Sequence, residues 1–328
     1  MMTPQERTRL LARVSLAGTV LVLVVIVTSA FLRLVQFGVG CEDWPACYGA
    51  AQAAPGASRS AYAYLVPWMR VLHRIAAAGV GLLAIVVAAC ACSTPRRPEH
   101  VVVAVALAAL TMFLAVLGRA AAGSQLPAVT LGNVLGGMAM LGLFWWLRLE
   151  CSAAPRAGTS ALLIASALAA LLLAIQFALG TLVSAHHASA ACPDFPGCHA
   201  AVASGWDFAA FNPWNSFGRD AAAAAARSSL HMAHRWGAWI VLAYLGGLLV
   251  VLWRHGVAAR ALAAAAFLLC TQFALGIAVV LLDVPLVVTA AHNGVSGVLL
   301  IAVLRLTFHS RPAEGASVSA ACQMVISK

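Results

Sequence analysis

The hydrophobic residues of this chain fall into long runs rather than into the narrow stripes of a soluble amphipathic helix. Short segments that contain charged residues, Pro and Gly separate the runs. A run of roughly 20 apolar residues crosses the hydrocarbon core of a bilayer as a helix. We therefore predict eight membrane-spanning helices, at residues 14–36, 67–92, 100–119, 127–149, 160–184, 229–253, 258–281 and 285–308.

The composition supports an all-α polytopic membrane protein. Of the 328 residues, 63% are hydrophobic and only 9% are charged, and the mean hydropathy is +0.94. A soluble domain cannot bury so much apolar surface, whereas lipid surrounds it and each helix satisfies its own backbone polar groups. The first run follows basic residues, as in a signal peptide, but it is too long and lacks a small-residue cleavage signal, so we keep it as a helix.

The chain has a net charge of +10, and its basic residues lie mostly at the ends of the apolar runs. We therefore expect the basic residues to set the topology, with no nucleic-acid partner and with both termini in the cytoplasm of a bacterial cell. The long loops at 37–66 and 185–228 then face the periplasm, and we expect a disordered tail at 311–328. The basic residues at the cytoplasmic ends are Arg7, Arg9, Arg13, Arg96, Arg97, Arg148, Arg156, Arg254, Arg260, Arg305, Arg311 and Lys328.

An internal repeat relates the two parts of the chain. Four anchors recur in the same order, separated by 151 to 161 residues. The matches are CEDWPAC (41–47) with CPDFPGC (192–198), VLHRIAAAGVG around His73 with MAHRWGAWIVL around His234, TMF at Thr111 with TQF at Thr271, and PAVTLGN (127–133) with PLVVTAAH (285–292).

The repeat predicts two tandem four-helix bundles, an N-terminal half at 1–155 and a C-terminal half at 156–310. Each half has an even number of helices, so both halves cross the membrane in the same direction. The expected relation is a pseudo-twofold axis along the membrane normal.

His234 and His292 are the first candidates for chemistry. They lie about five and seven residues from the outer ends of their helices. At 1.5 Å per residue, both imidazoles are then roughly 8 to 10 Å below the outer boundary of the membrane. Two imidazoles at one depth suit axial ligation of a heme iron inside a bundle. Arg235 and His231 are candidates to meet the propionates, and the alternative is that each His is a hydrogen-bonded packing residue.

The equivalent positions of the first half are His73, followed by Arg74, and Asn133. Asn is a weak, hard-oxygen ligand, so this half is expected to leave one iron position open, as a substrate heme requires. The alternative is a duplicated site that lost its ligand and only packs.

Two cysteine pairs stand in the predicted outer loops, where disulfides persist. We predict the disulfides Cys41–Cys47 and Cys192–Cys198, and both a structural and a redox-active role stay open. His186, His187 and His199 are expected to be solvated loop residues.

These features together resemble the heme A synthase family, which is related to a mitochondrial oxidase assembly factor. The features are two Cys-x5-Cys loops around Asp-aromatic-Pro, a His-Arg pair at the outer start of the second and sixth helices, and a His in the eighth. The resemblance spans nearly the whole chain.

The resemblance implies an oxidoreductase that oxidises the C8 methyl group of heme O to a formyl group, giving heme A for cytochrome oxidase. It implies a heme b held by His234 and His292, and a substrate heme held by His73. The implied partners are a heme O synthase, an electron donor such as ferredoxin or the quinol pool, and the oxidase assembly machinery. Copper is a further candidate cofactor, and a homo-oligomer is a candidate state in the lipid.

Two positions depart from the pattern of many members of this family. Many have a second His in the fourth helix, where this chain has Asn133, and a Glu three residues before the His of the second helix, where this chain has Arg70. We therefore place Arg70 beside His73 in the candidate catalytic site, with Glu42 or Asp43 of the first loop supplying the carboxylate.

Three other functions are compatible with parts of the pattern. A bis-His electron-transfer cytochrome would need a ligand where Asn133 stands. A thiol-disulfide oxidoreductase usually has a closer pair than Cys-x5-Cys. A non-catalytic heme-binding assembly factor would share every feature except the reaction.

Overall fold

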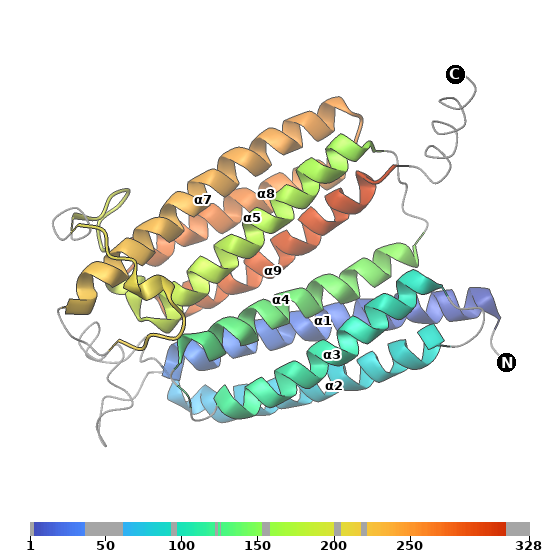
Figure 1. Ribbon diagram of the computed structural model, residues 1–328, viewed down its shortest axis with the longest axis horizontal. Coiled ribbons are helices and arrows are strands. Elements are labelled where there is room, and N and C mark those ends of the chain that lie inside the picture. The colour runs from blue at the N-terminus through green and yellow to red at the C-terminus, as the bar shows by residue number, and fades with distance from the viewer. Residues whose placement is uncertain are drawn as a thin grey trace.

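The computed structural model describes residues 3–36, 62–92, 97–121, 124, 126–152, 158–199, 205–217 and 222–312. Long helices lie side by side in two groups (Figure 1). They are α1 (Pro4–Gln36), α2 (Val66–Cys92), α3 (Pro98–Ala121), α4 (Pro127–Glu150), α5 (Ser160–Ala185), α7 (Ala222–Arg254), α8 (Ala259–Leu281) and α9 (Leu286–His309), with the short 3-10 helices η1 (Ala63–Leu65), η2 (Ala188–Ala190) and η3 (Ala209–Phe211).

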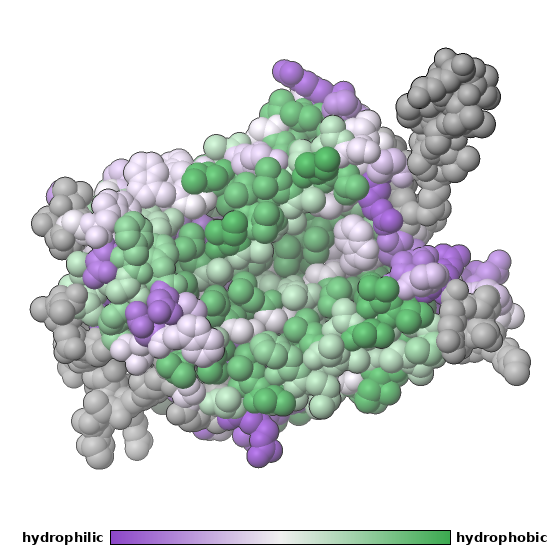
Figure 2. Space-filling view, viewed as in Figure 1, coloured by the Kyte–Doolittle hydropathy of each residue, from purple (hydrophilic) through white to green (hydrophobic). Residues whose placement is uncertain are grey.

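Within these ranges eight helices are long and apolar enough to cross a membrane, and no strand occurs. The all-helical class and the eight predicted runs are therefore confirmed. Many large apolar side chains are exposed along the helices, which a lipid environment explains and water does not. Figure 2 shows these hydrophobic residues covering the middle of the molecule, with hydrophilic residues gathered mainly towards its ends.

Two helices begin earlier than the apolar runs predicted. Helix α1 begins at Pro4 because Thr3 and Glu6 form a capping box, in which Thr3 Oγ1 accepts from the Glu6 amide at 3.2 Å and Glu6 Oε2 accepts from the Thr3 amide at 2.8 Å. Helix α7 begins at Ala222 in a run of alanines, the best helix formers. The apolar runs marked the membrane spans and missed these helical extensions.

The helices pack as two groups of four. In the first, α1 contacts α2 and α4, and α3 contacts the same two helices; in the second, α5 contacts α7 and α9, and α8 contacts the same two helices. Separate clusters of buried apolar residues fill the two groups. The groups meet through α1 and α4 on one side and α5 and α9 on the other (Figure 1).

Several predictions fall outside the described residues. They concern the Cys41–Cys47 disulfide, the loop carboxylates Glu42 and Asp43, and most of the tail at 311–328. The second cysteine pair is described, and Cys192 and Cys198 form the predicted disulfide, with their Cα atoms 5.0 Å apart.

Candidate functional site

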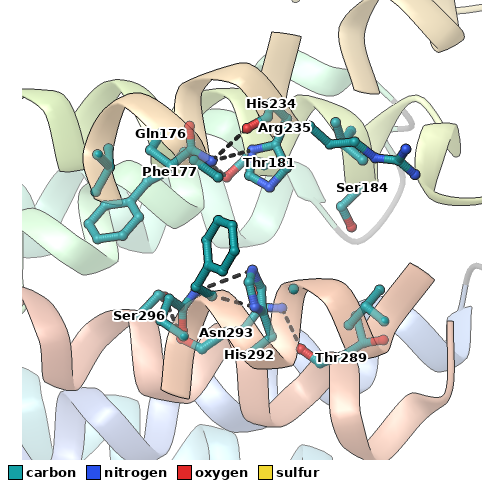
Figure 3. A pocket seen from close by; sticks show the side chains of 18 of the residues that line it. Gln176, Phe177, Thr181, Ser184, His234, Arg235, Thr289, His292, Asn293 and Ser296 are labelled. Carbon is teal, nitrogen blue, oxygen red and sulfur yellow. Dashed lines mark hydrogen bonds between the residues drawn. The ribbon is translucent and has the colours of Figure 1, made fainter. Parts of the chain in front are cut away.

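The second group of helices encloses an apolar cavity lined by α5, α7, α8 and α9, with additional residues from α1 and α4. His234 of α7 and His292 of α9 line it, and the two rings point toward each other across it (Figure 3). The structure therefore brings together the two histidines that the sequence placed at similar depths in the membrane.

Each of these histidines is held by a glutamine from a neighbouring helix. Gln176 of α5 places its Nε2 atom 3.0 Å from Nδ1 of His234 and donates to the His234 carbonyl at 2.9 Å. Gln272 of α8 places Nε2 3.3 Å from Nδ1 and 3.2 Å from Nε2 of His292. The side-chain oxygens of both glutamines are buried without a hydrogen-bond partner in the described structure.

A glycine one turn beyond each glutamine makes room for the imidazole. A Cβ atom on Gly180 would lie 2.8 Å from Cε1 of His234, and one on Gly276 would lie 3.2 Å from Cε1 of His292. Each ring therefore packs closely against the backbone of the neighbouring helix, which restricts its orientation.

The sequence contained a signal for these residues that the search for repeats missed. The pentapeptide Gln-Phe-Ala-Leu-Gly occurs twice, at 176–180 and 272–276. It lies on α5 and α8, which both belong to the second group of helices. The repeat between the two halves has a spacing of 151 to 161 residues, whereas the two pentapeptides lie only 96 residues apart.

Arg235 is buried and binds the disulfide loop. Its guanidinium donates to the backbone carbonyls of Cys192, Asp194 and Gly197, and it lies 5.9 Å from the centre of the Phe195 ring. Because Arg235 follows His234 directly, the loop closed by the disulfide is tied to the helix turn that carries this histidine.

His186 is a correction to the sequence analysis. It was predicted to be solvated, but only 3% of it is exposed, because it packs against the Phe217 ring at 5.3 Å and Arg227 donates to its carbonyl at 3.1 Å. Burial, with a smaller effect of Arg227, lowers the pKa of His186 to about 4. The residue is therefore part of the buried packing between the end of α5, Phe217 and Arg227.

His199 lies on the surface, as predicted, with its side chain 91% exposed. Its Nδ1 atom is 2.7 Å from Oδ2 of Asp194. This hydrogen bond is the largest of the effects that lower the pKa of the Asp194 carboxyl. His231, one turn before His234, also lines the cavity and has a buried Nδ1 atom without a partner in the described structure.

In the first group of helices, His73 is half-buried on α2 and contacts Thr28 of α1, with Nδ1 and Oγ1 3.2 Å apart. The Thr28 hydroxyl also lies 2.7 Å from the Val24 carbonyl, so in the tautomer with a proton on Nδ1 the hydroxyl donates to Val24 and accepts from His73. This leaves Nε2 of His73 unprotonated, as a metal-ligating histidine requires.

The other predicted residues of this group are less enclosed. Arg70 and Arg74 are exposed on α2, while Asn133 is half-buried on α4. Met112, which stands where the TMF–TQF match places Gln272, is 67% exposed. At these two matched positions the first group has neither the histidine nor the glutamine of the second.

An arginine near the end of α1 connects the two groups. Arg33 of α1 donates from Nε to Ser184 Oγ and from Nη2 to Asn293 Oδ1, each at 3.3 Å. Ser184 and Asn293 line the cavity, and Asn293 follows His292 directly. The sequence analysis did not single out Arg33, because its partners are 151 and 260 residues away.

Known proteins resemble this chain over nearly its whole length. Residues 12–304 match the family described as cytochrome oxidase assembly protein. A protein of Shewanella oneidensis named heme A synthase is 31% identical over 323 residues, which cover 91% of this chain and 95% of that protein.

Proposed function

The chain belongs to the cytochrome oxidase assembly protein family, and we propose that it acts there as a heme A synthase. In this role it is a multi-pass membrane oxidoreductase that converts heme O to heme A. The observation that carries the proposal is the pair of facing imidazoles, His234 and His292, inside an apolar cavity of a protein from this family.

The residues around the cavity fit a bis-His heme b. A ligating histidine donates its Nδ1–H to an acceptor while Nε2 binds the iron. The carboxamides of Gln176 and Gln272 lie beside the two imidazoles, and their unpartnered Oε1 atoms are the candidates for such acceptors. Bound there, the heme supplies iron redox chemistry.

Positive charge at the rim of the cavity fits the propionates of a heme. Arg235 comes from α7 and donates to backbone carbonyls of the disulfide loop, and Arg33 reaches Ser184 and Asn293 at the rim from α1. His231 adds a buried nitrogen that has no partner in the described residues. We assign these three residues, with Arg235 foremost, to the polar edge of the heme.

We propose that the first group of helices holds the substrate, heme O. His73, oriented by Thr28, provides one iron ligand, and Asn133 leaves the opposite position open. In this proposal Arg74 binds the propionates of heme O, and Arg70 lies beside His73 in the catalytic site. Glu42 supplies a carboxylate from the loop that lies outside the described residues.

The ring-like packing in both groups supports two tandem bundles, at 1–155 and 156–310, related by a pseudo-twofold axis along the membrane normal. The basic helix ends support cytoplasmic termini and periplasmic cysteine loops in a bacterial inner membrane. The proposed partners are a heme O synthase, which supplies the substrate, and a ferredoxin or quinol, which donates electrons. Copper stays a prediction, because the described residues contain no cluster of three metal-binding side chains.

The decisive experiment is to produce the chain together with a heme O synthase and to analyse the extracted hemes by chromatography and mass. Hydroxylated or formylated heme is the expected product. The matched control is His73→Ala, which should abolish conversion while leaving the low-spin heme of the second group. An unchanged heme O pool beside bound heme b would contradict the synthase and favour a carrier.

A further inference from the structure

A second, smaller cavity lies far from the histidines, in the seam where the two groups of helices meet. It is lined by residues of α1, α4 and α9 and by the turn after α4. Thirteen residues of α9 separate its arginine from His292, which corresponds to about 20 Å along the helix. The lining residues are Leu16, Trp145, Arg148, Leu149, Ser152 and Arg305.

Two arginine residues, the half-buried Arg148 and the exposed Arg305, contribute to the lining of this cavity and have no described counterion. Neither Arg148 nor Arg305 has an ion pair or hydrogen bond to another residue in the described ranges. The nearby carboxylate Glu150 is bound to Arg311. Two positive charges in one small space repel each other, so an anion between them is stabilised from both sides.

Trp145, which also lines the cavity, has an unused neutral donor. The indole Nε1 atom of Trp145 is buried and has no hydrogen-bond partner among the described residues. An indole N–H can only donate, and a buried donor without an acceptor costs free energy. The Ser152 hydroxyl donates to the Leu149 carbonyl at 2.7 Å and forms no hydrogen bond with the indole in the described structure. An oxyanion bound beside Arg148, Arg305 and Trp145 would give these three donors an acceptor.

The position favours a lipid over a free anion. Arg148 lies in the last turn of α4 and Arg305 four residues before the end of α9, which is headgroup depth for membrane-spanning helices. Leu16 and Leu149 provide an apolar wall, and Leu16 is 45% exposed towards the surroundings. Basic pockets between helices at this depth are typical binding sites for anionic lipid headgroups.

We propose that this cavity binds the phosphodiester group of an anionic phospholipid, held by Arg148, Arg305 and the Trp145 indole in the seam between α4, α1 and α9. The lipid would connect the two groups of helices at the end opposite to Arg33. The inference is independent of the proposed enzymatic function, because no residue of this cavity contacts the histidine site.

The test is to purify the full chain in detergent, add phosphatidylglycerol, and measure bound lipid by mass spectrometry and the melting temperature by scanning fluorimetry. The wild-type protein should retain phosphatidylglycerol and melt higher in its presence. Removing each arginine in Arg148→Gln and Arg305→Gln should weaken binding about fivefold. Trp145→Phe, which keeps the ring and removes the N–H, should weaken binding less.

The matched control is Arg254→Gln, an exposed basic residue in the last turn of α7 that does not line the cavity; it should bind the lipid as the wild type does. Equal binding of phosphatidylcholine, an equal thermal shift with inorganic phosphate, or unchanged binding by the Arg148→Gln/Arg305→Gln double variant would each overturn the assignment. Circular dichroism of every variant separates loss of binding from loss of fold.

Discussion

The two groups of helices share a packing pattern but differ in the polar residues that they direct inward. His73 matches His234, and both have a side chain from the preceding long helix at Nδ1, Thr28 in one case and Gln176 in the other. On the opposite side, Asn133 and Met112 stand where the second group has His292 and Gln272. The ligand and its hydrogen-bond partner differ together.

The histidine and the glutamine are thus both absent from the matched positions of the first group, which indicates that the two differences concern one site. A histidine that binds iron depends on the residue at its other ring nitrogen, so a change of the ligand alone would leave a buried glutamine without use. The first group instead has an amide and a thioether at these positions. This arrangement fits the proposal of a permanent heme in the second group and a substrate heme in the first.

The largest expected effect comes from removing a ligand of the complete pair. His234→Ala and His292→Ala should each abolish the low-spin heme spectrum, because a single imidazole cannot maintain six-coordinate ligation. Absorption spectra and heme content of the purified proteins measure this. His73→Ala is the control in the other group, and a normal low-spin spectrum in both variants of the second group would disprove the ligand assignment.

The difference between the two groups can also be tested by giving the first group the residues that it lacks. Asn133→His combined with Met112→Gln should add a second low-spin heme signal and abolish most conversion of heme O, because both iron positions are then occupied. Asn133→Ala, which keeps the position open, is the control. Undiminished conversion in the double variant would show that the open position is not needed.

The support of the ligands should matter less than the ligands themselves. Gln272→Leu should weaken heme binding about 10- to 100-fold and shift the midpoint potential, since the Nδ1 acceptor is lost. A heme titration followed by potentiometry measures both quantities. Met112→Leu, at the matching position of the first group, should change neither, and equal effects in both variants would contradict the paired difference.

The glycine beside His234 offers a finer test. Gly180→Ala should turn the imidazole by crowding Cε1, and Gly276→Ala should have a smaller effect because its Cβ would lie farther from the ring, at 3.2 Å rather than 2.8 Å. Electron paramagnetic resonance of the oxidised heme reports ligand orientation. Gly246→Ala on α7, where no atom lies within 4 Å of the added Cβ, should leave the spectrum unchanged.

The smallest expected effect concerns His186, which is buried at the end of α5. The pKa of His186 is about 4 in the folded protein and about 6.5 in an unfolded chain, so unfolding takes up a proton between these values. Stability should therefore fall as the pH decreases from about 6.5 to about 4. Denaturant melts in detergent across this range test it; His186→Phe should flatten the dependence, and His199→Ala should not.

The sequence predicted the helices well because the signal for each of them is local. Run length and the breaks between runs located all eight spans, and the misjudged starts at Pro4 and Ala222 lie outside the apolar runs. The histidine pair was predictable because the repeat marked its members. His186 was misjudged because its burial depends on Phe217 and Arg227, 31 and 41 residues further along the chain.

The sequence by itself determined the number of spans and the presence of Asn133 where the second copy of the repeat has His292, since composition and order encode these features directly. Only the tertiary structure decided which residues support the histidines. The rotation of each helix about its axis and its contacts with non-neighbouring segments place Gln176 and Gln272 on the rings, Arg33 on the rim, and Arg235 on the disulfide loop. Such contacts depend on the mutual packing of the helices, which no single run of residues specifies.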